Sequence, residues 1–157
     1  MRLHKTRKGF SLIELVIVVM IIGIIGAIAI PRLSRGSEGA KINAFVAELD
    51  NFAKAIQMYQ AQTGNRVLDS SSGTFPTDLG DYLHQNSWEG ETPIGGLWDI
   101  EVDGVGGHSL SVGVHFMGVS VDTDAVQQVD EAMDDGNLAT GAFQKIASDR
   151  YYLIPEN

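Results

Sequence analysis

An almost unbroken apolar run over residues 10–30 constrains this chain more than any other feature of its sequence. A helix of that length measures roughly 30 Å at ~1.5 Å per residue, which matches the hydrocarbon thickness of a bilayer. Fourteen of its residues are Leu, Ile, Val or Phe, and together these favour insertion by roughly 6 kcal/mol. The sequence therefore predicts a single transmembrane helix over residues 10–30.

One carboxylate, Glu14, interrupts this run. A carboxylate at the bilayer centre costs about 3 kcal/mol on the insertion scale and less near the edge, so insertion still dominates. Basic residues ahead of the run favour the cytoplasmic side. We therefore expect a cytoplasmic N-terminus and an external C-terminal region. The basic residues are Arg2, Lys5, Arg7 and Lys8.

The remainder of the chain is acidic. The whole sequence has 11 Lys and Arg against 20 Asp and Glu, a formal net charge of −9 at pH 7. Such a surface repels nucleic-acid phosphates, so we expect no nucleic-acid partner. The absence of cysteine excludes disulfides, thiolate catalysis and cysteine-ligated zinc. An exported domain of this kind is held by its core, by a metal or by neighbouring subunits.

The stretch KGFSLIELVIVVMIIGIIGAIAIPRL, residues 8–33, resembles the prepilin-type N-terminus of type IV pilins and type II secretion pseudopilins. In that family a prepilin peptidase cuts after the glycine on the cytoplasmic face and methylates the new N-terminus. The resemblance implies a basic leader over residues 1–9, cleavage between Gly9 and Phe10, and N-methylation of Phe10. It also implies an assembly role for Glu14.

The chemistry of Glu14 suits such a role. Cleavage after Gly9 would create a positive α-amine at Phe10, and the free N–H groups at a helix start carry partial positive charge. Pairing an acid with such charge matters more at low dielectric than in water. The residues alone leave three partners open, namely its own N-terminus, that of a neighbouring subunit, or none; the resemblance implies the neighbour.

A long helix is expected to continue beyond the apolar run. Pro31 lacks an N–H and clashes with the carbonyl four residues earlier, which predicts a helix kink and a flexible segment over residues 31–39. Residues 40–63 carry apolar side chains at intervals of three and four, which predicts an amphipathic helix. Gly64 is typical of a helix end. The helix as a whole is expected over residues 10–63.

Residues 64–157 are predicted to form an acidic α+β head. The fold class expected from the sequence is pilin-like, with the long N-terminal helix packed on a small antiparallel sheet. The expected elements are a short helix over residues 77–83, a hairpin of residues 97–102 and 108–116, a helix over residues 123–133, and a second hairpin of residues 143–146 and 151–154.

The only credible ion site lies after the second of these head helices. Calcium needs six to eight oxygen ligands, and ligands close in sequence gather them most readily. Asp134, Asp135 and Asn137, within a larger acid group, are the candidate calcium ligands. The resemblance agrees, since some major pseudopilins bind calcium in a loop of the head. The alternative is a solvated turn, because Asp-Gly-Asn is also good turn chemistry. The other acids of the group are Asp122, Asp124, Asp130 and Glu131.

No catalytic site is predicted. His84, His108 and His115 have neither metal-ligand spacing nor a neighbouring nucleophile in sequence, and the glycine-rich turns lack a phosphate-loop pattern. We expect no enzyme activity and no cofactor other than calcium. A membrane-anchored enzyme or binding module remains the remote alternative, which a deep pocket lined by His108 or His115 and several acids would favour.

The resemblance implies a mechanical function. The preferred interpretation is a type II secretion pseudopilin, which assembles into a pseudopilus that drives protein export. The alternative is a type IV pilus subunit. The lack of cysteine departs from many pilins and favours a pseudopilin, whereas the head lacks the Trp-Gly-x-Pro-Tyr signature of major pseudopilins. The implied partners are the prepilin peptidase, other pilin or pseudopilin subunits, the inner membrane, and a secretion or pilus assembly platform. The implied location is the bacterial inner membrane with a periplasmic head, and then the filament.

Overall fold

The computed structural model describes residues 9–104 and 107–154; within the first helix, the side chains of residues 26–36 lie outside the description. The chain divides into two compact units, Met1–Glu38 and Gly39–Asn157. Apart from Gly9, the predicted basic leader lies outside the described residues. The side chain of Pro31 does so as well.

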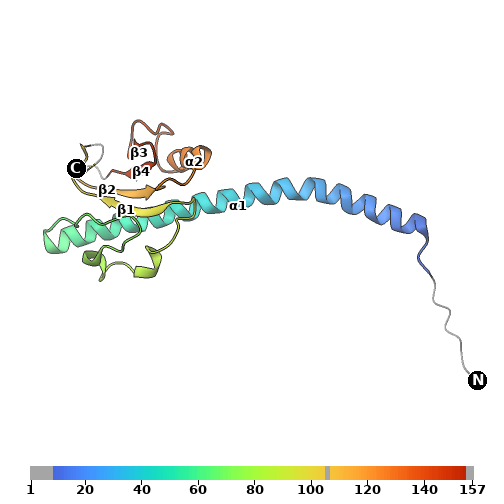
Figure 1. The fold of residues 1–157 in the computed structure, drawn as a ribbon, viewed down its shortest axis with the longest axis horizontal. Coiled ribbons are helices and arrows are strands. Elements are labelled where there is room, and N and C mark those ends of the chain that lie inside the picture. The colour runs from blue at the N-terminus through green and yellow to red at the C-terminus, as the bar shows by residue number, and fades with distance from the viewer. Residues whose placement is uncertain (1–8, 105–106, 155–157) are drawn as a thin grey trace, which may run out of the picture. The chain divides into compact units, whose positions relative to one another are not determined.

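The helix α1 spans Leu12–Thr63 (Figure 1). Its backbone is assigned as helix throughout residues 31–39, the segment expected to be flexible; a bend at Pro31 stays a prediction. The helix ends where the sequence predicts, since Gly64 has a φ of 69° and its N–H donates to the carbonyl of Gln60 at 2.9 Å. A glycine in the left-handed region is a common helix end, because it has no Cβ to clash there.

Four strands form one antiparallel sheet in the order β1-β2-β4-β3. Both predicted hairpins are confirmed, since β1 pairs with β2 and β3 pairs with β4. Pairing of β2 with β4 joins the two hairpins. The helix α2 lies between β2 and β3 in the chain. The bounds are β1 Leu97–Glu101, β2 Ser111–His115, α2 Thr123–Met133, β3 Phe143–Ala147 and β4 Arg150–Leu153.

The part of α1 within the second unit packs against the sheet through aromatic side chains. Phe45 and Phe52 of α1 and Trp98 of β1 are at most 2% exposed. The ring of Trp98 stacks on Phe45 with 4.9 Å between centroids and meets Phe52 edge-on at 4.8 Å. The predicted amphipathic stripe of residues 40–63 therefore contributes to the core of the head, which also contains α2 side chains.

Two 3₁₀ turns lie between α1 and β1, η1 at Thr77–Leu79 and η2 at Gln85–Ser87. The helix predicted over residues 77–83 is wrong in type, because only the single turn η1 forms. Pro76 occupies the N-cap position and makes no side-chain cap hydrogen bond, and Gly80, directly after the turn, disfavours a helix. The turn is fixed by Leu79, which is fully buried.

Candidate functional site

The predicted cleavage position lies ahead of the first helical turn. Gly9 and Phe10 belong to no helix or strand and are exposed, Phe10 by 78%. The first helical residue is Leu12. Chain segments of this kind are the preferred sites of proteolysis, because their backbone is not held in a hydrogen-bonded element.

Glu14 caps the start of its own helix. The Ser11 N–H donates to Glu14 Oε2 at 2.8 Å, and the Leu15 N–H donates to the Ser11 carbonyl at 3.2 Å. A glutamate that reaches back to the N–H three residues earlier forms one half of a capping box. This contact was not among the sequence predictions, although Ser-x-x-Glu before an apolar run is its recognised signature. The second carboxylate oxygen, Oε1, has no hydrogen bond within the described part of the chain.

Residues 12–25 of α1 present apolar side chains in all directions. Between Leu12 and Ile25 the large apolar residues are 45–80% exposed. A surface of this kind marks an interaction site, since a helix that is apolar all round is normally covered by lipid or by other helices. Among the residues that the structure describes, no helix has the combined length and hydropathy needed to cross a membrane.

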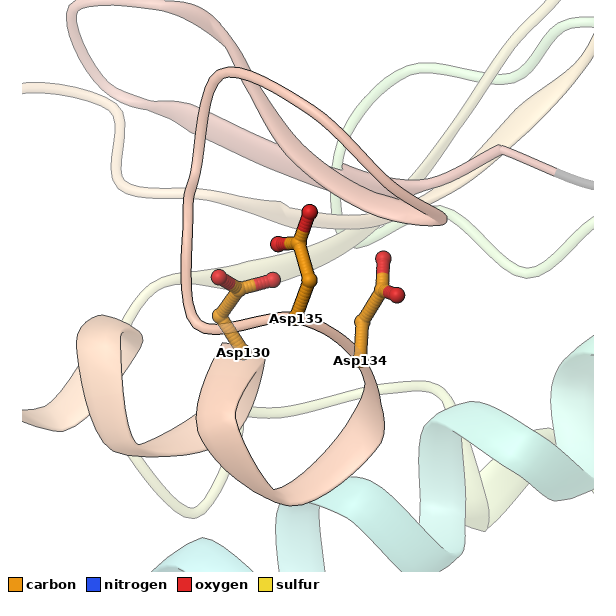
Figure 2. Close-up of side chains that lie close together, drawn as sticks. All are labelled: Asp130, Asp134 and Asp135. Carbon is orange, nitrogen blue, oxygen red and sulfur yellow. The ribbon is translucent and has the colours of Figure 1, made fainter.

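Three acids meet at the C-terminal end of α2. One carboxylate oxygen from each of Asp130, Asp134 and Asp135 lies within 4.8 Å of the others. Figure 2 shows the three side chains pointing from the end of α2 and the two residues directly after it toward the loop that follows. The side-chain oxygen of Asn137, the third predicted ligand, accepts from the Ala139 N–H at 3.3 Å. We call Asp130, Asp134 and Asp135 the acidic cluster.

Asp130 is the unusual member of the acidic cluster. Its side chain is 0% exposed, and neither carboxylate oxygen has a hydrogen-bond partner among the described residues. Burial, together with the negative charges of Asp135, Asp134 and Glu131, raises the pKa of Asp130 to about 6. Asp130 was predicted from the sequence only as a member of the wider acid group. Its spacing of four residues from Asp134 on a helix is the signal that brings the two side chains onto one face.

A second polar group surrounds His115 at the end of β2. Its Nδ1 lies 2.8 Å from Ser72 Oγ, and its Nε2 lies 3.2 Å from Asp149 Oδ2. The structure thus brings His115 together with a hydroxyl and acids that are distant in sequence. The His115 side chain is only 12% exposed, which favours a role in holding strands and loops together. His84 and His108 do not join this group, since they lie in the loops before η2 and β2.

A glycine lets two buried polar groups meet across the sheet. Asp99, Gly113 and Tyr152 lie side by side on β1, β2 and β4. The Tyr152 hydroxyl donates to Asp99 Oδ2 at 2.5 Å, and both residues are at most 3% exposed. Desolvation raises the pKa of Asp99, and hydrogen bonds from Tyr152 and Ser72 oppose that rise. The contact crosses β2, so it depends on the missing side chain at position 113.

We expect Tyr152→Phe to lower the free energy of unfolding by about 2 kcal/mol, because it removes a hydrogen bond to a buried, charged acceptor. Urea denaturation of the full chain in detergent, followed by tryptophan fluorescence, measures the loss. The matched control is Tyr82→Phe, whose hydroxyl donates to Gln62 at the surface and which should cost less than about 1 kcal/mol. Equal losses for the two variants would contradict the importance of the buried contact.

Comparison with known protein families identifies the N-terminal segment. Residues 4–30 match the model of the prokaryotic N-terminal methylation motif. Searches of curated proteins and of solved structures gave no match to this chain. The matched range contains Gly9, Phe10 and Glu14, which confirms the resemblance drawn from the sequence and supports a type IV pilin-like protein. The chain carries the N-terminal signature of type IV pilins and pseudopilins.

Proposed function

We propose that this chain is a pilin-like structural subunit that a prepilin peptidase cleaves between Gly9 and Phe10, and that then polymerises. The match over residues 4–30 carries the proposal. The exposed, non-helical position of Gly9 and Phe10 directly before α1 supports it, because a peptidase needs such access. In this proposal the subunit is a substrate of the peptidase and catalyses no reaction itself.

Before assembly, the apolar segment over residues 10–30 anchors the subunit in the inner membrane. Its hydropathy and the basic residues ahead of it support this topology, with the head of residues 64–157 in the periplasm. The exposed apolar side chains between Leu12 and Ile25 support the second state as well, since helices of neighbouring subunits would replace lipid in the filament.

Glu14 then links one subunit to the next. In the single chain, Glu14 Oε2 accepts from the Ser11 N–H, and a carboxylate can accept further hydrogen bonds. We propose that the other oxygen receives the α-amine of Phe10 from a neighbouring subunit. The capping contact holds the carboxylate close to the helix start, where it would fix the axial position of the neighbour.

A type II secretion pseudopilin is the system we propose, with a type IV pilus subunit as the second candidate. The absence of cysteine supports the former, because many type IV pilins close a C-terminal loop with a disulfide. The missing Trp-Gly-x-Pro-Tyr signature points within that class to a minor or divergent pseudopilin. Neighbouring genes for a secretion ATPase and an outer-membrane channel would support this choice, and a retraction ATPase gene would support the pilus.

Glu14→Ala is expected to leave processing intact and to lower polymer yield at least about tenfold, which corresponds to about 1.4 kcal/mol per lost contact. The full chain is expressed with a prepilin peptidase and its assembly proteins. Mass spectrometry measures cleavage before Phe10 and N-methylation, and crosslinking measures the polymer.

The matched control for this experiment is Glu38→Ala, which removes an exposed acid of the same helix outside the matched motif. It should assemble normally. Normal assembly of Glu14→Ala would contradict the linking role of Glu14. A functional mature protein that still carries residues 1–9 would contradict the proposed function as a whole.

A further inference from the structure

The acidic cluster combines a metal-compatible spacing with a buried acid that has no partner. Oxygens bonded to one calcium ion at ~2.4 Å lie at most ~4.8 Å apart, and the three carboxylate oxygens fall within 4.8 Å of one another. Asp130 is 0% exposed with both oxygens unpartnered in the described part of the chain. Figure 2 shows its carboxylate beside that of Asp135. Buried ionised groups are normally paired or coordinate a metal.

The other two acids are held in place by hydrogen bonds from the following loop. Asp135 Oδ1 accepts from the Asn137 N–H at 2.8 Å, and Asp135 Oδ2 accepts from the Thr140 hydroxyl at 2.8 Å. Asp134 Oδ2 accepts from the Ala142 N–H. A carboxylate oxygen that accepts one hydrogen bond keeps a second lone pair. These contacts therefore position ligands without consuming them.

The charge balance favours a cation from solution. The ion pairs formed by described residues involve other acids, so the three negative charges of the acidic cluster lack a basic side-chain partner within that part of the chain. Asp134 and Asp135 are exposed, which leaves room for water to complete a coordination shell. Calcium tolerates six to eight oxygens in irregular geometry, whereas magnesium demands a near-ideal octahedron.

From these observations we propose that the head binds one calcium ion through Asp130, Asp134 and Asp135. The buried carboxylate of Asp130 binds the ion from the protein interior, and the carboxylates of Asp134 and Asp135 bind it from the solvent side. The ion joins the end of α2 to the loop that leads into β3, so its binding stabilises the head. This site is independent of the proposed processing and assembly of the subunit.

The test uses the full chain in detergent, freed of metal with EDTA and then dialysed. Calorimetric titration with calcium chloride should give a saturable heat for one site, with a Kd of roughly 10⁻⁴ to 10⁻³ M, as in extracellular calcium modules. Fluorescence of the two tryptophans, Trp88 and Trp98, which are both buried in the unit Gly39–Asn157, reports melting of the head. At about 5 mM calcium, the Tm should rise by about 5 °C.

Two variants make the assignment specific. Asp135→Asn alters an exposed ligand, so the variant should fold and should lose the calcium-dependent rise in Tm. Glu131→Gln makes the same charge change one residue beyond Asp130, outside the acidic cluster, and should keep at least half of the rise. Magnesium at the same concentration should produce a smaller rise.

Absence of heat together with an unchanged Tm at about 10 mM calcium would overturn the proposal, and would assign the buried carboxyl to a proton shared with Asp135. An undiminished response in Asp135→Asn would overturn it as well. Neither readout depends on cleavage by the peptidase or on polymer formation, so failure of this site and failure of the proposed function are distinguishable.

Discussion

The Gly113→Ala chain is expected to lose at least about 4 kcal/mol of stability, a large fraction of the roughly 5–15 kcal/mol that holds an ordinary domain folded. A methyl group at position 113 would lie 2.6 Å from Cα of Tyr152 and closer still to the Tyr151 carbonyl oxygen. These are backbone atoms of β4, which cannot move away as the end of a flexible side chain can. Either β4 shifts or its pairing with β2 is lost.

The cost is large because β2 and β4 join the two hairpins of the sheet. Shifting β4 would also separate Tyr152 from Asp99, whose contact passes over Gly113. A buried carboxylate would then lack its main donor. Urea denaturation of the full chain in detergent, followed by the fluorescence of Trp88 and Trp98, measures the combined effect.

Gly39→Ala is the control for this substitution. Gly39 lies inside α1, and a methyl group there would have no atom within 4 Å outside its own local helix backbone. Alanine favours a helix over glycine, so this variant should gain about 0.5–1 kcal/mol. A Gly113→Ala chain with wild-type stability would show that β4 can yield, and would contradict the tight packing of the sheet.

Local sequence patterns predicted both α-helices and both hairpins, but not the pairing between the hairpins. Residues 123–133 form α2 within the predicted bounds, because Val126 and Val129 repeat at helical spacing and Asp122 caps the first turn. The pairing of β2 with β4 depends on Gly113. A lone glycine in a strand pattern signals close approach of another backbone, but it does not name which strand approaches.

Site residues divide in the same way. Gly9, Phe10 and Glu14 could be named because the motif is contiguous and matched over residues 4–30. The group around His115 could not, since Ser72 and Asp149 are brought to it by loops between different strands. The place of Asp130 in the acidic cluster could have been predicted from the sequence, because a helix puts residues four apart on one face. Its complete burial depends on the loop after α2, which no periodicity encodes.

Asp130→Asn is expected to stabilise the metal-free chain by about 2–3 kcal/mol at about pH 7.5. The pKa of Asp130 is raised from 3.8 to about 6 in the folded chain. Between these two pH values the folded state therefore keeps a proton on Asp130 that the unfolded state has released. The stability that this carboxyl contributes is present below about pH 4 and is lost as pH rises through about 6. The total loss is about 3 kcal/mol.

Asparagine has a similar shape and no charge, so the variant does not lose stability as pH rises through the pKa of Asp130. Its amide still lacks hydrogen-bond partners. Urea denaturation in EDTA between about pH 4 and pH 8 should give a wild-type stability that falls relative to the variant as pH rises. Other acids titrate in both chains, and the difference between the two curves therefore isolates Asp130. Parallel curves would contradict a raised pKa for this carboxyl.

Calcium should narrow the difference in stability between the two chains. An ion at the acidic cluster stabilises the ionised form of Asp130 and so offsets the free-energy cost of burying its charge. The Asp130→Asn chain loses one of the three carboxylate ligands, so calcium should stabilise it little. With a Kd of roughly 10⁻⁴ to 10⁻³ M, about 10 mM calcium should raise wild-type stability by roughly 1.4–2.7 kcal/mol and so remove much of the variant's advantage at about pH 7.5. If the variant is about 2–3 kcal/mol more stable than the wild type both in EDTA and in calcium, then Asp130 binds no cation. The substitution changes the side-chain volume very little, so the charge of residue 130 and not its packing decides which chain is more stable.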